Sequence, residues 1–181
     1  MKTNIQLLIL FLTLNLISRN GNAQVTETDT KKQTTAADFS EIESGSFPKP
    51  IGAINDYGQI LTESQREELT KILYDYHIGT TRQIVVVTID SIKPYNNIQR
   101  YSTDLGNEWG VGTGEGNNGL IIVVCNFCRQ IGIATGTETE LILTDEICKE
   151  VIDKTIIPEF KNGEFYNGIT KGVTELIERW K

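Results

Sequence analysis

Two apolar runs near the middle of the chain constrain its fold more than any other feature. Residues 83–89 and 120–125 consist mostly of Val, Ile and Leu. Such runs are typical of strands that are covered on both faces, as in parallel sheets with helices above and below. Segments with helical periodicity precede, separate and follow these runs, at 62–79, 98–109, 144–157 and 165–180. The alternation of strands and helices predicts a layered α/β fold with a mostly parallel sheet.

Local signals predict where two of the helices begin and end. Thr62 is followed three residues later by Gln65, which is the pattern of a capping box, and Gly79 is expected to end that helix. Thr144 is expected to begin a later helix, and Pro158 to end it, because proline cannot continue the backbone hydrogen bonds.

Turn-forming residues between the apolar segments predict one short strand and one hairpin. A strand-like stretch at 51–54 is followed by Asn55-Asp56-Tyr57-Gly58, whose composition predicts a turn. After the second central strand, Cys125-Asn126-Phe127-Cys128 predicts a tight turn into residues 129–135. This segment therefore adds one antiparallel hairpin to the sheet.

The first residues have the composition of a secretory signal peptide. Lys2 precedes an apolar stretch at 5–17, and Gly21-Asn22-Ala23 supplies the small residues that a signal peptidase requires. We expect cleavage after Ala23 and an exported protein, periplasmic or secreted; an uncleaved membrane anchor is the alternative. Residues 24–49 are polar and predict a flexible acidic arm, and residues 50–181 predict one soluble domain.

The charge balance argues against nucleic acid as a partner. The chain has 17 Lys and Arg against 24 Asp and Glu, a net charge of −7. Removal of the signal peptide takes away Lys2 and Arg19, so 15 basic residues remain and the net charge becomes −9. An acidic surface repels phosphate backbones, whereas it suits divalent cations.

A glycine-rich loop is the first candidate binding site. Residues 104–119 read DLGNEWGVGTGEGNNG. A phosphate loop follows a strand and opens a helix, but here a helix precedes and a strand follows, so no nucleotide is expected. Calcium and magnesium take oxygen ligands, which this segment offers through Asp104, Glu115, Asn117 and Asn118. The alternative is a solvated loop that only turns the chain, and composition does not decide between the two.

A second candidate site lies at the other end of the sheet. Asp56 follows the first predicted strand and Asp90 follows the next, and ligands of α/β sheets usually bind at the carboxyl ends of strands. The glycine loop and residues 136–145 are expected to start at the opposite edge. Both candidate sites remain open at this point.

Residues for covalent or zinc chemistry are few. His77 is the single histidine, and no serine lies in a nucleophile-elbow pattern. A zinc site would need His77, Cys125, Cys128 and Cys148 to converge, and no zinc is expected. Cys125 and Cys128 flank a two-residue turn, where a local disulfide or two structural thiols are expected rather than a redox centre. The state of the three cysteines is left open.

The order and spacing of several short motifs resemble the TPM domain family. The resemblance covers about residues 52–177. This family occurs in exported bacterial proteins, thylakoid-lumen photosystem-repair factors and nematode receptor modulators. The motifs that carry it are, in chain order, Ile54-Asn55-Asp56 with Gly58 and Leu61-Thr62, the valines at 85–87, Trp109-Gly110-Val111-Gly112, Asn118-Gly119-Leu120, Arg129, Gly136, Leu143-Thr144-Asp145, and Pro158-Glu159-Phe160 with Gly163 and Gly168.

The resemblance implies a three-layer α/β/α Rossmann-like sandwich. It also implies divalent-metal binding, as in some members, and the weak acid phosphatase activity of the plant branch. Asp56 corresponds to the family's aspartate after the first strand, and Arg129 to its basic residue in the hairpin. The family's glycine-loop signature corresponds to Trp109, Gly110, Gly112, Asn118 and Gly119.

Three functional hypotheses follow. The first is an exported protein that binds calcium or magnesium through Asp56, Asp90 and the group of Asp104, Glu115, Asn117 and Asn118. The second is a metal-assisted acid phosphatase with Asp56 and Arg129 as candidate catalytic residues, so enzymatic activity is left undecided. The third, by analogy alone, is a chaperone or adaptor for envelope or membrane proteins. A stand-alone domain also predicts a diffusible monomer.

Overall fold

The computed structural model describes residues 47–112, 114 and 116–181. The predicted signal peptide, most of the predicted arm and Glu115 lie outside the described residues. The strands are β1 (Ile54–Asp56), β2 (Gln83–Ile89), β3 (Gly119–Cys125) and β4 (Gln130–Thr135). The helices are α1 (Glu63–Thr80), α2 (Ile98–Glu108), α3 (Thr137–Glu140), α4 (Asp145–Val151), the π-helix η1 (Ile152–Ile156), α5 (Ile157–Lys161) and α6 (Phe165–Arg179).

The four strands form one mixed sheet in the order β1-β2-β3-β4. β1, β2 and β3 run parallel, and β4 pairs antiparallel with β3 across the hairpin. Gln83 pairs with Gly119 and Ile89 with Cys125, so β2 and β3 are in register along their whole length. This arrangement confirms the predicted mostly parallel sheet with one antiparallel hairpin.

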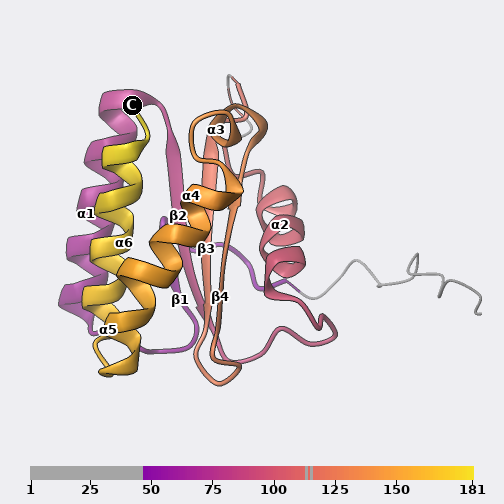
Figure 1. Cartoon of the computed structure of the whole chain (residues 1–181), viewed down its shortest axis with the longest axis vertical. Coiled ribbons are helices and arrows are strands. Elements are labelled where there is room, and N and C mark those ends of the chain that lie inside the picture. Colours follow the sequence, from indigo (N-terminus) through magenta and orange to yellow (C-terminus); the bar gives the residue numbers. More distant parts are fainter. Residues whose placement is uncertain (1–46, 113, 115) are drawn as a thin grey trace, which may run out of the picture. The chain divides into compact units, whose positions relative to one another are not determined.

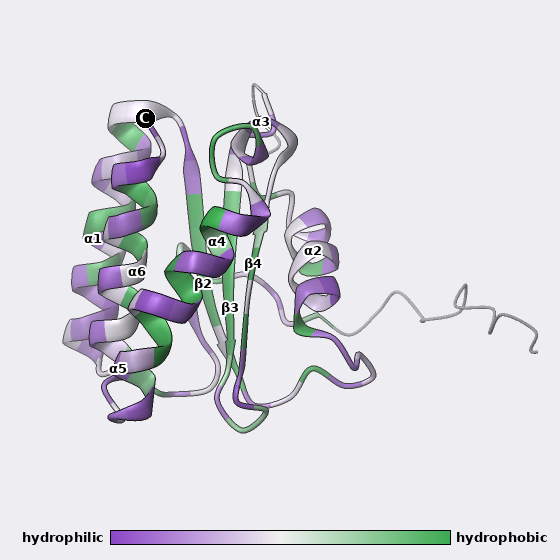
Figure 2. Cartoon of the chain, in the orientation of Figure 1, coloured by the Kyte–Doolittle hydropathy of each residue, from purple (hydrophilic) through white to green (hydrophobic). Residues whose placement is uncertain are grey.

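Helices cover both faces of the sheet and give three layers (Figure 1). Alternate residues of β2 point to opposite faces: Ile84 and Val86 join the cluster under α1, α4 and α6, whereas Val85 and Val87 join the cluster under α2. In Figure 2 the central strands β2 and β3 are mostly hydrophobic, apart from the start of β2 at Gln83, as expected for strands covered on both faces. The three-layer α/β/α fold is therefore confirmed. No helix in the described part of the chain has the length and apolar character that a membrane span requires.

The face that carries α2 is completed by the segment before β1. Phe47 packs against Tyr95 and Tyr101, with ring centroids 5.8 and 5.2 Å away. The indole N–H of Trp109 donates to the carbonyl of Pro48 at 3.0 Å. Phe47 and Pro48 belong to the predicted arm, and these contacts hold them against the domain.

The predicted start of α1 is confirmed, and its predicted end is wrong. Thr62 accepts a hydrogen bond from the amide of Gln65, and the Gln65 side chain accepts one from the amide of Thr62, which completes the capping box. The helix continues through Gly79 and ends one residue later, at Thr80. Thr81 takes the left-handed conformation that a glycine was expected to supply, with φ of 63°.

The first strand lies later than predicted. Residues 51–54 were expected to be extended and 55–58 to turn, yet β1 is Ile54–Asp56. Asn55 is fully buried. Its side-chain amide is satisfied there, since it accepts a hydrogen bond from the amide of Ile51 and donates one to the carbonyl of Gly52. A buried polar group is tolerated when it is hydrogen-bonded, so composition alone does not identify this strand.

Pro158 does not end the helix that begins after Thr144. The π-helix η1 interrupts the regular hydrogen-bond ladder, and α5 begins after it at Ile157. Pro158 therefore falls in the first turn of a new α-helical segment. Pro158 lacks the amide hydrogen that would continue the ladder, and the π-helical segment directly before it is where the regular hydrogen-bond pattern changes.

Gly132 of β4 allows α2 to approach the sheet closely. A Cβ atom at this position would lie 2.6 Å from Ser102 Oγ and 3.1 Å from the carbonyl oxygen of Ile98. We expect Gly132→Ala to lower the free energy of unfolding by about 1–3 kcal/mol, measured by urea denaturation, because α2 must move away. Gly79→Ala is the matched control: Gly79 is helical with nothing within 4 Å of the added atom. Gly79→Ala should raise the free energy of unfolding by about 0.5 kcal/mol. Equal effects of both variants would contradict the close approach of α2 to Gly132.

Candidate functional site

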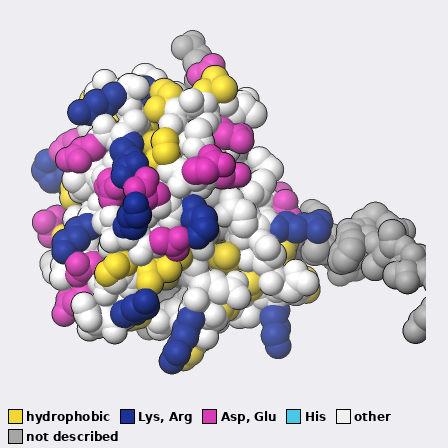
Figure 3. All heavy atoms as spheres, in the orientation of Figure 1, with side chains coloured by type: hydrophobic (Ala, Val, Ile, Leu, Met, Phe, Trp, Pro, Cys, Tyr) yellow, Lys and Arg dark blue, Asp and Glu magenta, His cyan; other side chains and the backbone are white. Residues whose placement is uncertain are grey.

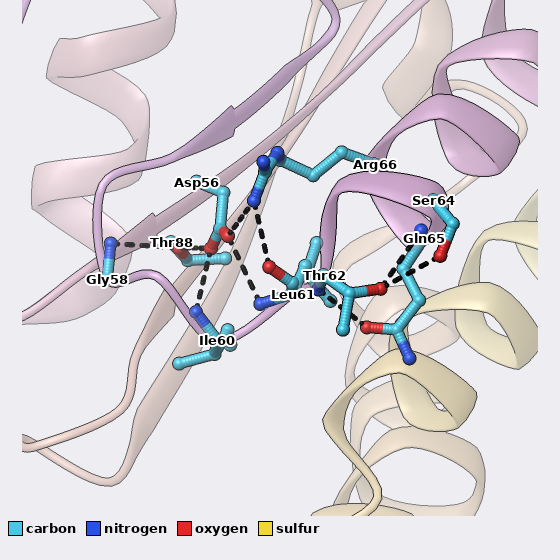
Figure 4. Close-up of polar contacts among 9 residues, drawn as sticks. All are labelled: Asp56, Gly58, Ile60, Leu61, Thr62, Ser64, Gln65, Arg66 and Thr88. Carbon is cyan, nitrogen blue, oxygen red and sulfur yellow. Dashed lines mark hydrogen bonds and ion pairs between the residues drawn. The ribbon is translucent and has the colours of Figure 1, made fainter.

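The carboxylate of Asp56 is the most densely bonded polar group at the carboxyl edge of the sheet (Figure 4). Its Oδ1 accepts from the amide of Ile60 at 3.1 Å and from the hydroxyl of Thr88. Its Oδ2 accepts from the amide of Leu61 at 3.1 Å and from Arg66 Nη1 at 3.4 Å. Only 1% of the Asp56 side chain is exposed.

These four donors give Asp56 a structural role. A carboxylate has about four lone-pair positions, and the four donors occupy them. The contacts join the end of β1 to the connection that follows it, to β2 through Thr88 and to α1 through Arg66. A metal ion at Asp56 would have to displace donors that the buried carboxylate needs. The geometry therefore does not favour the predicted role of Asp56 as a metal ligand.

Asp90 lies beside this turn, at the same edge of the sheet. β1 and β2 are parallel, with Asp56 paired to Thr88, so Asp90 follows two residues later. A Cβ atom on Gly58 would lie 3.5 Å from Asp90 Oδ1. Asp90 is exposed, whereas Asp56 is enclosed. The predicted shared edge is present, although Asp56 is already fully hydrogen-bonded.

Asp104 does not belong to the glycine loop. It lies within α2, where its carboxylate accepts from the hydroxyl of Tyr95 at 3.0 Å and pairs with Arg100 at 3.7 Å. Both partners lie toward the start of α2, whereas the loop follows the end of that helix. The predicted grouping of Asp104 with Asn117 and Asn118 is therefore not formed by these contacts.

The glycine loop starts at the amino edge of the sheet, as predicted. The Gln83 side chain accepts from the amide of Gly112 at 2.7 Å, and the Gln83 amide donates to the carbonyl of Asn118 at 3.1 Å. Gly112, Gly116 and Asn117 have φ of 74°, 95° and 48°. This left-handed backbone conformation explains why glycines occur at these positions, because residues other than glycine and asparagine rarely adopt it.

Glu138 is the acidic residue that the sequence did not assign to this loop. A Cβ atom on Gly116 would lie 2.2 Å from Glu138 Oε2, so this carboxylate sits directly on the loop. A Cβ atom on Gly136 would lie 2.0 Å from the carbonyl oxygen of Asn117, which shows how closely the two segments pack. The sequence offered one signal for this contact, because residues 136–145 were predicted to begin at the same edge of the sheet as the glycine loop. Among the described residues, no three His, Cys, Asp or Glu side chains form a metal-binding group.

Arg129 lies on the hairpin, away from Asp56. It lines a pocket of about 570 Å³ together with Asn126, Gln130 and residues of α5. β1 and β4 are the two edge strands, three strand spacings or about 14 Å apart. Asp56 and Arg129, the two candidate catalytic residues, therefore do not converge on one substrate group.

The cysteines are divided between a disulfide and a buried thiol. Cys125 and Cys128 form a disulfide across the hairpin turn. Cys148, a residue of α4, is free and buried, and burial raises the pKa of its thiol to about 11. His77 lies in the last turn of α1, with Nδ1 3.2 Å from the carbonyl oxygen of Arg82. These residues therefore lie in three different elements.

Asp56→Asn tests the structural role of the buried carboxylate. It replaces one oxygen, which accepts from one backbone amide and one side-chain donor, with an amide nitrogen that cannot accept, so we expect the free energy of unfolding to fall by about 2–4 kcal/mol in the presence of EDTA. Asp90→Asn is the control and should change stability by less than about 0.5 kcal/mol, because Asp90 is exposed. A loss for Asp56→Asn that appears only when calcium is added would instead indicate a metal ligand.

Thiol labelling tests the state of the cysteines. At pH 8 about one Cys148 side chain in 1000 is ionised when its pKa is about 11, and the thiolate is the reactive form. Folded protein should therefore take up no iodoacetamide within minutes, whereas protein in urea should take up one label, measured by mass spectrometry. Labelling of Cys125 or Cys128 without a reductant would contradict the disulfide.

The fold is shared with solved bacterial domains. The N-terminal domain of a protein from P. gingivalis is 27% identical, with a TM-score of 0.65 over 70% of this chain and 80% of that chain. The N-terminal domain of cg2496 from Corynebacterium glutamicum is 18% identical, with a TM-score of 0.56 over 77% of this chain and 85% of that chain. BA42 from Bizionia argentinensis is 17% identical, with a TM-score of 0.58 over 67% of this chain and 86% of that chain.

The family assignment rests on the sequence match as well as on the fold. None of the curated proteins matches the chain. The TPM domain matches residues 54–179, from the start of β1 to the end of α6. That range includes the Asp56 network, the glycine loop and the hairpin with Arg129. The chain belongs to the TPM domain family.

Proposed function

We propose that this protein is an exported TPM-domain protein that binds calcium or magnesium at the glycine loop. The observation that carries the proposal is the carboxylate of Glu138, which lies against Gly116. The backbone carbonyl of Asn117, the residue after Gly116, lies against Gly136 and adds a further oxygen to the loop. Carboxylates, amides and backbone carbonyls are the oxygen ligands that calcium takes, at six to eight per ion.

The proposed affinity is low. Glu138 is the one carboxylate that the described residues bring onto the loop, so water would complete the coordination. Extracellular calcium modules with few charged ligands bind in the range of about 0.1–1 mM. This range suits an exported protein, and export itself is proposed from the signal-peptide pattern that ends at Ala23.

A hydrolytic function is less well supported than cation binding. Asp56, the candidate for metal or nucleophilic chemistry, is fully hydrogen-bonded. The pocket that holds Arg129 is lined by no Asp, Glu, His, Ser or Thr among the residues described there. Phosphoryl transfer without a metal needs a nucleophile or a base close to the bound phosphate. We retain the adaptor hypothesis as a proposal by family analogy, without a contact that favours it.

Calcium titration followed by NMR tests the proposed site. We expect saturable shifts of the amides of Gly112, Gly116 and Gly136, with a midpoint near 1 mM. Glu138→Gln should weaken binding about tenfold, because it removes the carboxylate charge that the described residues bring onto the loop. Glu178→Gln, which removes the same charge from an exposed position of α6, should leave the midpoint unchanged.

Two results would contradict the proposal. The first is the absence of any saturable calcium or magnesium binding at millimolar concentration. The second is a set of shifts centred on Gly58 and Asp90, which would place the cation at the opposite edge of the sheet. Isothermal titration calorimetry of the same variants gives an independent measure of the affinity.

A further inference from the structure

A pocket lies where the β3–β4 hairpin meets the start of α6. Its volume is about 570 Å³, within the range of small-molecule sites. Figure 1 places the hairpin turn and α5 at the lower end of the sheet, and in Figure 3 Lys and Arg side chains border hydrophobic ones along this lower edge. The lining residues are Val124, Cys125, Asn126, Arg129, Gln130 and Ile131 from the hairpin, and Ile157, Phe160, Lys161 and Phe165 from α5 and α6.

The two charged residues of this pocket are both basic. Arg129 is the only arginine in the described residues whose guanidinium makes no ion pair or hydrogen bond. Lys161 likewise makes no ion pair within residues 47–181 as described. The nearest acids in the sequence have other partners, since Glu159 pairs with Lys171 and Glu164 accepts from Asn167. On a chain with a net charge of −7, two unpaired cations that line one pocket indicate an anionic ligand.

The backbone at Arg129 is unfavourable for an arginine. Its φ is 52°, in the left-handed region where glycine and asparagine are preferred. The amide of Arg129 donates to the carbonyl of Asn126 at 3.1 Å, and the disulfide between Cys125 and Cys128 closes the same turn. Glycine fits this turn geometry better than arginine, so the presence of arginine indicates that its side chain has a function, such as binding a ligand.

Apart from Lys161, the side of the pocket formed by α5 and α6 is an apolar and aromatic wall. The rings of Phe160 and Phe165 lie 5.0 Å apart, and both residues are half-buried. A Cβ atom on Gly168 would lie 2.6 Å from the Phe160 ring, so this glycine gives the ring its place against α6. Ile157 extends the wall along α5. Such a wall binds the apolar body of a ligand by burying its surface.

We propose that this pocket binds a small organic anion, an aryl carboxylate, with the carboxylate at Arg129 and Lys161 and the ring against Phe160 and Phe165. The planar guanidinium matches a carboxylate through two parallel hydrogen bonds, and Lys161 adds a second positive charge. The ring stacks on or against aromatic side chains. This site is separate from the proposed cation site, which lies at the other edge of the sheet.

Binding of 2-naphthoate, measured by calorimetry and by NMR, tests the proposal. We expect saturable binding with a dissociation constant below about 1 mM, and shifts of the Arg129 amide, the Ile157 methyl groups and the Phe160 and Phe165 rings. Acetate, which lacks the ring, and 2-naphthalenemethanol, which lacks the charge, should each bind at least tenfold more weakly. Equal binding of the neutral alcohol, or shifts elsewhere, would overturn the proposal.

Arg129→Gly is the decisive variant. Glycine suits a φ of 52°, so the melting temperature should stay the same or rise, while 2-naphthoate affinity falls at least tenfold. Lys161→Ala should weaken binding several-fold, whereas Lys71→Ala, which removes the same charge from an exposed position of α1, should have no effect. Unchanged binding by Arg129→Gly would overturn the proposal.

Two further comparisons separate this site from other possibilities. Glu138→Gln should leave 2-naphthoate affinity unchanged, so failure of the cation proposal and failure of this one are distinguishable. 2-Naphthylphosphonate compares the head groups, because a phosphonate cannot be hydrolysed as a phosphate ester is. Stronger binding of the phosphonate with no binding of 2-naphthoate would overturn the choice of a carboxylate.

Discussion

The structure depends on one buried carboxylate at the carboxyl edge of the sheet. Asp56 accepts four hydrogen bonds, from two amides of the β1–α1 connection, from Thr88 on β2 and from Arg66 on α1. The short strand β1 has only three residues, so its pairing with β2 is limited. The carboxylate supplies the additional bonds that hold the first strand, the second strand and the first helix together. Loss of one partner would leave buried charge or buried amides unpaired, which costs more than the bond itself gains.

This assignment changes where ligand binding is expected. An aspartate at the end of a strand in an α/β sheet is an expected functional residue, but here its oxygens are already occupied. The remaining groups lie at opposite edges. The Glu138 carboxylate lies on the glycine loop at the amino edge, and Arg129 and Lys161 line a pocket beside the hairpin. We therefore propose a cation at one end of the sheet and an anion at the other.

The sequence predicted elements whose signals are local or periodic. The central strands follow from continuous branched residues, and the start of α1 follows from Thr62 and Gln65. The predictions failed where a distant or unusual contact replaced the local preference. β1 contains Asn55 because side-chain bonds satisfy its buried amide, and Pro158 remains within a helical segment because η1 precedes it. Of the candidate site, the two edges were predicted correctly, whereas the partner contacts of Asp104 and Glu138 were not.

By itself, the sequence determined the α/β class, the mostly parallel sheet, the hairpin and the family. These follow from hydrophobic periodicity, caps and motif spacing, which are properties of neighbouring residues along the chain. Only the tertiary structure decided that Asp56 is enclosed, that Glu138 lies on the glycine loop and that the Arg129 guanidinium has no ion pair among the described residues. Those outcomes depend on which side chains meet across the sheet edges, at separations of 22 residues for Gly116 and Glu138 and 32 for Asp56 and Thr88. The packing of strands and helices determines these contacts between distant residues, and no local sequence pattern encodes them.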